Sequence, residues 1–236
     1  MSSVLMILSG ATVWSQKDGI QRPTGFWGEE FTTPHRLFTE AGLSITLATP
    51  AGAPAIVDEV SLSLDANGGD AAKVAELSAY LKAYADLLRT PKRLEDIDLA
   101  DYDGVFVPGG HGPMQDLAVN ETVGRILSKA LADPGKVVGA LCHGPAAFLS
   151  AGDARAWPFN GRKLTAFSNS EETQVGLAAN APWLLEDRLV AGGAKFEAGV
   201  PWAPHIVVDG NLVTGQNPAS ADVTTQAFLK AIAERR

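Results

Sequence analysis

Short apolar runs rich in β-branched residues alternate along this chain with segments of helical periodicity, and this alternation constrains the fold more than any other feature. The runs that we expect to form strands are 4–8, 45–48, 105–107, 137–141, 164–167, 206–208 and 212–214. The segments that we expect to form helices are 27–41, 71–88, 121–132, 144–150, 182–190 and 220–234. Strands that alternate with helices form mostly parallel sheets, with helices on both faces and right-handed crossovers. The sequence therefore predicts a three-layer α/β protein.

Two local features refine this fold. Asp209-Gly210-Asn211 separates the last two expected strands and is a hairpin signal, so we expect one antiparallel pair in the sheet. The segment 65–95 looks like an extra helix before the third strand, and we expect it to form a small helical cap beside the site. We find no internal repeat, low-complexity tract or linker, and 236 residues suit one large α/β unit. The expectation is a single domain over 1–236.

The composition and charge limit the classes of partner. Apolar residues make up 46% of the chain and charged residues 19%, and no apolar run is long enough to span a bilayer. Nineteen basic against 27 acidic residues give a net charge of −8, which disfavours nucleic acid and anionic membranes as partners. The first expected strand begins almost at Met1, which leaves no room for a signal peptide, and one cysteine cannot form an internal disulfide. We therefore expect a cytoplasmic location.

The only cysteine, Cys142, stands where the apolar run 137–141 ends and a small-residue helical segment begins. This is the outline of a nucleophile elbow, a sharp strand-to-helix turn that lifts one side chain clear of the sheet, and Gly144 removes a Cβ that would collide with the turn. The following helix end favours a thiolate, so we expect a thiol pKa of roughly 6.5 or lower, against about 8.5 for a free cysteine. The alternative is a buried cysteine that packs as an apolar residue.

The loops that follow strands matter most, because ligands of such sheets bind at the carboxyl ends of the strands. Pro108-Gly109-Gly110 follows a strand and offers bare backbone N–H groups for an oxyanion, although an ordinary tight turn explains the glycines as well. The loop lacks the Gly-Lys-Ser/Thr of a phosphate loop and the third glycine of a dinucleotide fingerprint, so we expect no cofactor. The loop 214–220 is interpreted only as a turn and a helix cap.

A proton donor or acceptor for Cys142 follows from helical phase. One stripe of the expected helix, with 3-4-3-4 spacing, contains Trp27, Glu30, Pro34, Leu37 and Ala41. Glu29 falls on the polar stripe, whereas Glu30 falls on the buried one. Burial without a nearby cation raises the pKa of a carboxyl, so we expect Glu30 to be partly neutral near pH 7 and able to exchange a proton. The alternative is a different register with both glutamates solvated.

His143 is the most informative of the four histidines, because it is adjacent to Cys142. Its backbone N–H is a candidate for the oxyanion hole, and its ring can stabilise a thiolate if a carboxylate orients it. Glu172 is the candidate carboxylate. The same residues, Asn169 to Glu172, also fit a helix N-cap with a capping-box glutamate, and the sequence leaves these two roles open. No histidine shows metal-ligand spacing, so we expect no metal site.

Five segments together carry a resemblance to the ThiJ/PfpI superfamily, whose fold is similar to that of class I glutamine amidotransferases. The segments are TGFWGEE at 24–30, DYDGVFVPGGHGPMQDL at 101–117, ALCHGPAAF at 140–148, SNSEET at 168–173 and DGNLVTGQNPAS at 209–220. The chain resembles most the glyoxalase III and stress-chaperone branch. The resemblance implies a flavodoxin-like sandwich, with the elbow nucleophile on Cys142, its partner on His143, and the buried helix glutamate on Glu30. It also implies that Glu172 pairs with the histidine and that the N–H groups of Gly110 and His143 form the oxyanion hole.

The activity that this resemblance implies is a cofactor-independent glyoxalase III, a lyase of the D-lactate dehydratase type. Such an enzyme converts methylglyoxal and related 2-oxoaldehydes to 2-hydroxy acids through a cysteine hemithioacetal, without glutathione or metal. The superfamily also includes redox-sensing chaperones (holdases), deglycases, cysteine hydrolases and isocyanide hydratases, so the fold alone does not decide the activity. The resemblance further implies a homodimer, which neither charge nor periodicity demands.

Overall fold

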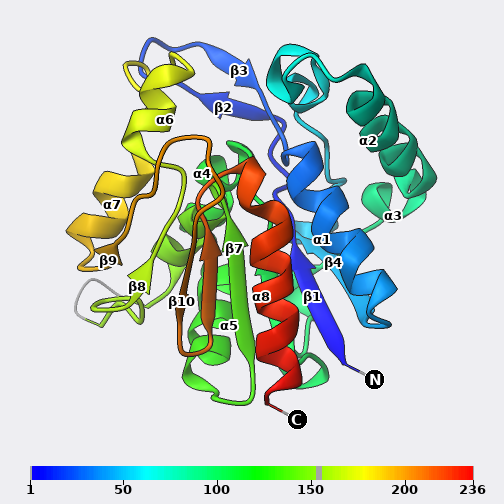
Figure 1. Cartoon of the computed structure of the whole chain (residues 1–236). Coiled ribbons are helices and arrows are strands. Elements are labelled where there is room, and N and C mark those ends of the chain that lie inside the picture. Colours follow the sequence, from blue (N-terminus) through cyan, green and yellow to red (C-terminus); the bar gives the residue numbers. More distant parts are fainter. Residues whose placement is uncertain (1, 153–155, 236) are drawn as a thin grey trace.

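A seven-stranded sheet forms the centre of the computed structural model, which describes residues 2–152 and 156–235 (Figure 1). Its strands, in spatial order, are β10 (Ile206–Asp209), β11 (Leu212–Gly215), β7 (Val137–Leu141), β6 (Gly104–Val107), β1 (Ser3–Ile7), β4 (Ser44–Thr49) and β5 (Lys92–Arg93). All neighbours are parallel except β10 and β11, which form an antiparallel hairpin. The mostly parallel sheet with one antiparallel pair confirms the prediction.

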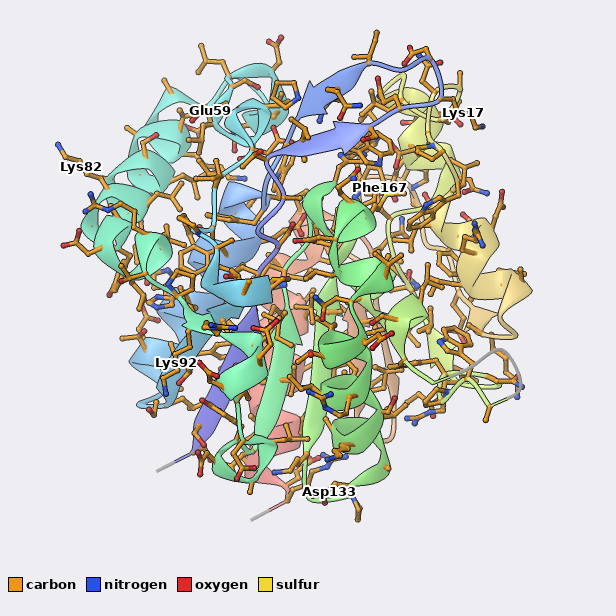
Figure 2. The ribbon with its side chains drawn as sticks, turned by 180° about the vertical axis from the view of Figure 1, so that it is seen from behind. Lys17, Glu59, Lys82, Lys92, Asp133 and Phe167 are labelled. Carbon is orange, nitrogen blue, oxygen red and sulfur yellow. The ribbon has the colours of Figure 1, made fainter. Side chains whose placement is uncertain are left out.

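Helices cover both faces of this sheet. In Figure 1, α1 (Gly28–Glu40) and α8 (Ala221–Ala233) lie in front of the strands. Seen from behind, in Figure 2, α5 (Glu121–Ala132) and the short α4 (Gly112–Gln115) cover the opposite face. The predicted three-layer, flavodoxin-like α/β arrangement is therefore confirmed.

The side chains of each central strand alternate between two hydrophobic clusters, one on each face. In β1, Leu5 and Ile7 pack on the α5 side, whereas Val4 and Met6 pack on the side of α1 and α8. Successive side chains of a strand point to opposite faces, so a strand buried on both faces must be apolar throughout. This explains why the central runs show no polar alternation in the sequence.

The expected strand 164–167 differs from the structure. Only β8 (Lys163–Leu164) is a strand, and it pairs with β9 (Lys195–Phe196) in a separate two-stranded sheet. The rest of the run passes alongside the end of β7, where the Phe167 N–H donates to the Cys142 carbonyl at 2.9 Å. A second two-stranded sheet, β2 (Val13–Ser15) with β3 (Gln21–Pro23), was not predicted.

The extra helical segment is broken at Tyr84 into α2 (Ala71–Ala83) and α3 (Ala85–Arg89). It packs on α1 through an ion pair between Lys73 Nζ and Glu29 Oε1 at 2.8 Å and a hydrogen bond between His35 Nδ1 and the Tyr80 hydroxyl at 2.9 Å. The inserted helical segment thus lies against α1, the helix that carries Glu30, and no residue of α2 or α3 lines the cavity described below.

The remaining elements are short. The other α-helices are α6 (Asn169–Gln174) and α7 (Leu185–Ala191). The 3₁₀ helices are η1 (Pro50–Gly52), η2 (Glu59–Leu62), η3 (Asp65–Asn67), η4 (Leu94–Asp96), η5 (Leu99–Asp101), η6 (Leu117–Val119), η7 (Gly144–Ser150) and η8 (Pro218–Ser220). Among the described residues, no helix combines the length and the apolar character that crossing a membrane requires.

Candidate active site

The turn after β7 holds Cys142 in a strained conformation. Its φ is 55°, in the left-handed region that side-chain-bearing residues rarely adopt. Backbone bonds fix it on both sides, since the Cys142 N–H donates to the Gly215 carbonyl at 2.9 Å and its carbonyl accepts from Phe167. A Cβ on Gly144 would lie 2.2 Å from the Val107 carbonyl oxygen, so the turn requires glycine there. The cysteine is buried, but it lines a cavity at the carboxyl end of the sheet.

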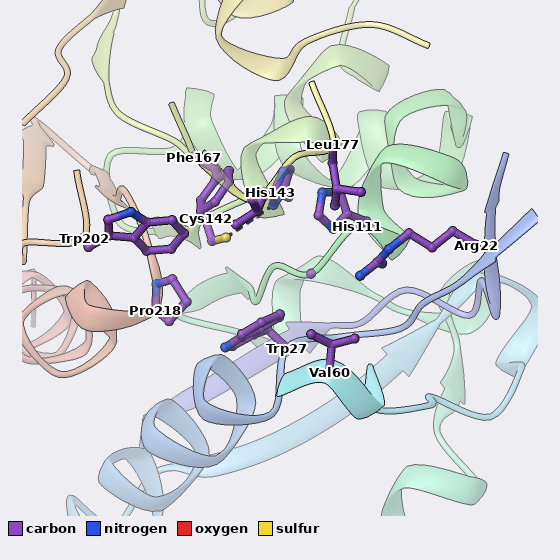
Figure 3. Close-up of a pocket in the computed structure, with 12 residues that line it drawn as sticks. Arg22, Trp27, Val60, His111, Cys142, His143, Phe167, Leu177, Trp202 and Pro218 are labelled. Atoms are coloured by element: carbon purple, nitrogen blue, oxygen red, sulfur yellow. Dashed lines mark hydrogen bonds between the residues drawn. The ribbon is translucent and has the colours of Figure 1, made fainter. Parts of the chain in front are cut away.

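His143 joins Cys142 to Glu172. The sulfur lies 3.3 Å from His143 Nδ1 (Figure 3). On the other side of the ring, His143 Nε2 lies 2.7 Å from Glu172 Oε2. Although burial acts to raise it, the two neighbouring histidines hold the pKa of Glu172 well below its ordinary value. An ionised Glu172 only accepts hydrogen bonds, so the Nε2 atom of His143 carries a proton. In the neutral ring, Nδ1 then presents its lone pair to the sulfur. The three side chains have the connectivity of a nucleophile, a base and an orienting carboxylate.

The sequence left two roles open for Glu172, helix capping and pairing with a histidine. In the structure, Glu171 has the first role and Glu172 has the second. Ser168 is the N-cap of α6 and forms a capping box with Glu171, the third residue of the helix. Glu172, one position further, turns toward the histidines. The capping box starts at Ser168, one residue earlier than predicted, and with this register Glu172 is available to His143.

Glu30 is fully buried on α1, as its helical phase predicted. Its Oε2 atom accepts a hydrogen bond from the Gly109 N–H at 2.8 Å, and Oε1 has no nitrogen or oxygen partner among the described residues. Burial raises the pKa of Glu30 to about 8, even though the neighbouring Cys142 thiol and the Gly109 N–H act to lower it. Glu30 is therefore mostly a neutral acid at pH 7. Glu29 is partly exposed and pairs with Lys73 instead.

The thiol differs from the expectation. Burial raises the pKa of Cys142 well above its ordinary value, and the Glu30 carboxyl acts in the same direction. The His143 backbone N–H lowers it, but the element that follows is a seven-residue 3₁₀ helix, η7, rather than a long α-helix with a strong dipole. The raised pKa favours a thiol in the resting site, rather than the thiolate that the sequence predicted.

The glycine loop after β6 lies against the elbow. A Cβ on Gly109 would lie 2.6 Å from Glu30 Oε2 and 2.7 Å from the His143 nitrogen, so glycine is required for this close approach. Gly110 has a φ of 95° and lines the cavity. Its N–H donates to no acceptor among the described residues. Gly110 and His143, whose N–H groups are predicted as oxyanion donors, line the same cavity as Cys142.

His111 is a site residue that the sequence analysis missed. Its Nε2 lies 3.0 Å from Glu172 Oε1, so the carboxylate accepts from a histidine on each oxygen. The His111 ring stacks on Trp14 at 4.5 Å and lies 4.1 Å from the His143 ring. Burial and the neighbouring His143 lower the pKa of His111 to about 4, so it is a neutral donor at pH 7. The sequence signal that could have identified His111 is its position directly after Gly110, in the loop predicted to face the site.

The cavity has a volume of about 160 Å³ and is largely apolar. Its apolar lining consists of Trp27, Val60, Phe167, Val175, Leu177, Trp202 and Pro218. The polar groups that face it are Cys142, the two histidines and Arg22, which pairs with Asp58 at 3.4 Å (Figure 3). A small, mostly apolar pocket with a few convergent polar groups is typical of a small-molecule site.

One group of described residues has atoms close enough to share a metal ion, namely His111, His143 and Glu172, whose ligand atoms lie within 4.8 Å of one another. Sequence spacing does not reveal this group because its members come from three separate segments. In the structure these atoms hydrogen-bond to each other.

The strained cysteine at the end of a central parallel strand, with a histidine and a carboxylate beside it, defines an α/β protein of the nucleophile-elbow class. Within that class, the chain belongs to the DJ-1/PfpI family, whose model matches residues 23–234. The resemblance of the five sequence segments is therefore confirmed.

Two relatives and one solved structure illustrate the similarity. The chain is 34% identical over 197 residues to glutamine amidotransferase-like class 1 domain-containing protein 1 of Bos taurus, covering 83% of this chain and 84% of the relative. It is 31% identical over 237 residues to the glutathione-independent glyoxalase HSP31 of Saccharomyces cerevisiae, covering 97% of each. The crystal structure of glyoxalase III from Candida albicans superposes with a TM-score of 0.82 at 29% identity, covering 98% of this chain and 97% of that one.

Proposed function

We propose that this protein is a glutathione-independent glyoxalase, which converts methylglyoxal and related 2-oxoaldehydes to 2-hydroxy acids such as D-lactate. The observation that carries the proposal is the pair of proton-exchanging groups at Cys142: a histidine whose Nδ1 accepts at 3.3 Å, and a buried carboxylic acid with a pKa of about 8. An aldehyde-to-acid isomerisation needs a nucleophile, a base for that nucleophile and a second group that moves a proton between carbons. The similarity to two glyoxalases over nearly the whole chain supports the same activity.

In the first step the Cys142 sulfur forms a bond to the aldehyde carbon while His143 Nδ1 takes the thiol proton. The π electrons of the carbonyl move to its oxygen, which the N–H groups of Gly110 and His143 stabilise. Neutral Glu30 gives its proton to this oxygen. The products are a hemithioacetal, a Glu30 carboxylate and an imidazolium on His143 that Glu172 stabilises.

In the second step Glu30 moves the proton between the two carbons. The carboxylate takes the hydrogen of the hemithioacetal carbon, and the ketone oxygen takes the proton of His143, which leaves an enediol. Glu30 then returns its proton to the second carbon, and the first hydroxyl gives its proton to His143. The result is a thioester of a 2-hydroxy acid on Cys142.

Hydrolysis closes the cycle. The Glu30 carboxylate takes a proton from water as the water oxygen attacks the thioester carbonyl, and the His143 imidazolium gives its proton to the departing sulfur. The hydroxy acid leaves, and Cys142, His143 and Glu30 regain their initial protonation states. The three steps as written require no cofactor or redox partner.

The test is lactate formation from methylglyoxal in glutathione-free buffer, which we expect for the wild type and not for Cys142→Ser. Turnover of an isocyanide, a peptide or a glycated amine in place of methylglyoxal would overturn the proposal in favour of a hydratase, hydrolase or deglycase. Absence of turnover, together with peroxide oxidation of Cys142 and suppression of aggregation, would favour a redox-sensing holdase.

We further propose that the protein acts in the cytoplasm as a homodimer of single-domain subunits. The lone, buried Cys142 suits a reducing compartment, and the dimer rests on membership of the family. Sedimentation as a strict monomer would remove the dimer from the proposal.

A further inference from the structure

Trp202 is held in a conformation that a bulky side chain avoids. It lies between β9 and β10, with a φ of 65°, in the left-handed region that favours glycine. Its side chain is 43% exposed, so burial of the indole in the core does not explain the strain. A bulky residue kept at positive φ is a reason to search for a function at that position.

Glu171 is the residue that fixes this backbone. The Trp202 N–H donates to Glu171 Oε1 at 2.9 Å, and Asn217 Nδ2 donates to the same oxygen at 2.8 Å. Gln216 Nε2 and the backbone and hydroxyl groups of Ser168 donate to Oε2. The buried Glu171 carboxylate thus accepts five hydrogen bonds from three segments, which is far more than helix capping requires. The loop 214–220, interpreted from the sequence as a turn, supplies two of these donors.

The indole ring is also fixed, and it faces the cavity. Its Nε1 donates to Gln174 Oε1 at 2.7 Å, and the ring packs edge-on against Phe167 at 5.6 Å. Figure 3 shows Trp202 and Pro218 on one side of the Cys142 side chain, and His111 and Arg22 on the other. The hydrogen-bonding groups are thus on one side of the sulfur and an aromatic wall is on the other.

We propose that Trp202 is a specificity-determining residue, which selects 2-oxoaldehydes with a flat apolar substituent, of aryl type, on the keto carbon adjacent to the aldehyde carbon that Cys142 attacks. Glu171 and Gln174 are positioning residues that hold the indole in place. The wall of Trp202, Phe167 and Pro218 offers ring faces and edges to such a substituent, and its indole N–H already donates to Gln174. A flat apolar substituent therefore gains more there than a methyl group or a polar one. The substrate class rests on the proposed function, whereas the wall itself does not.

The wall can be tested without turnover, because Cys142 is the only thiol in the chain. The ratio of its alkylation rates with iodoacetanilide and iodoacetamide reports how well the cavity accepts an aryl group. We expect this ratio to fall roughly tenfold in Trp202→Ala and by a smaller factor in Gln174→Ala, which removes an exposed side chain and leaves the core intact. The matched control is Val200→Ala, since Val200 is 72% exposed in the same loop and does not line the cavity.

The same variants are then compared for kcat/KM with phenylglyoxal and methylglyoxal. We expect Trp202→Ala to lower the phenylglyoxal-to-methylglyoxal ratio by a similar factor. An unchanged alkylation ratio in Trp202→Ala, or an equal fall in Val200→Ala, would contradict the proposal that the wall favours an aryl group. If the alkylation ratio falls as expected but the protein converts neither aldehyde, the role of the wall is supported and the proposed function is overturned. Circular dichroism of each variant checks that the fold is retained.

Discussion

At the scale of single residues, Glu30 and Glu29 are adjacent but have opposite environments. Glu30→Gln should lower lactate formation by roughly 10²- to 10⁴-fold, because the amide cannot take and return a proton. Glu29→Gln is the matched control, and it should leave turnover nearly unchanged because Glu29 only pairs with Lys73 at the surface of α1. Steady-state kinetics with methylglyoxal measure both. Reversed sensitivities would show that Glu29, and not Glu30, serves the site.

The same Glu30→Gln substitution should change how stability depends on pH. The pKa of Glu30 is about 8 in the folded protein, against 4.5 ordinarily, so the fold favours the protonated form. This contribution is fully present below pH 4.5 and is lost as the pH rises through about 8. Between pH 6 and pH 9, wild type should therefore lose on the order of a few kcal/mol relative to Glu30→Gln, which does not titrate. Urea unfolding at the two pH values measures the difference, and a constant difference would contradict the raised pKa.

His111 is the second residue-scale case, since it donates to the Glu172 oxygen that His143 leaves free. His111→Phe keeps a ring between Trp14 and His143 but removes this donor, which should lower kcat by roughly 10- to 100-fold. Without the donor the pKa of Glu172 rises, so the acid limb of the kcat profile should move to higher pH. His111→Gln, which retains an N–H donor, should recover part of the loss. Equal losses in both variants, with an unshifted pH profile, would mean that His111 serves only packing.

At the scale of elements, the elbow depends on the close contact between η7 and the end of β6. Gly144→Ala would place a Cβ 2.2 Å from the Val107 carbonyl oxygen, and backbone cannot move aside as a side chain can. We expect a loss of roughly 1–3 kcal/mol in unfolding free energy and a large loss of turnover as Cys142 leaves its strained position. The control is Gly135→Ala in an exposed turn, whose nearest neighbour is the Asp133 side chain at 3.2 Å. Similar effects of both variants would contradict the elbow's dependence on Gly144.

The elements that could be predicted from sequence are those with long, regular patterns. The central strands and α1, α5 and α8 were found because their apolar periodicity reports burial directly. The hairpin of β2 and β3 was missed, since three-residue strands carry too little pattern. The strand expected at 164–167 differs for another reason: only its start forms a strand, which pairs with β9 in a separate sheet, and the buried residues that follow do not join the central sheet.

The site was predictable where the chain itself fixes the geometry. Cys142 and His143 are adjacent, and the helical phase of α1 directs Glu30 inward, so local spacing was enough. The choice between the two roles of Glu172, pairing with a histidine and capping a helix, was not local, because only the approach of α6 to the histidines separates them. The pKa of the thiol was also beyond local reasoning. Its burial beside Glu30 outweighs the short helix that follows it.

At the scale of the whole molecule, the two hydrophobic clusters share their strands. In β6, Val105 and Val107 belong to the cluster under α5, whereas Phe106 belongs to the cluster under α1 and α8. Loss of one face would leave these strands exposed along half of their side chains, and a parallel sheet is stable only when both faces are covered. The two faces should therefore unfold together, as one domain.

Tryptophan fluorescence can test this cooperativity in a variant that has Trp27 and Trp202 replaced by Phe, since the other three tryptophans, Trp14, Trp157 and Trp183, all pack in the cluster under α5. Leu47→Ala removes a side chain from the opposite cluster, and Leu127→Ala removes one from the tryptophan side. Each should cost about 2–5 kcal/mol, and each should shift the urea transition seen by fluorescence together with the one seen by far-ultraviolet circular dichroism. If the faces were independent units, Leu47→Ala would leave the fluorescence transition in place and split the two signals. The strand sharing in β1, β6 and β7 predicts that the midpoints stay coincident in both variants.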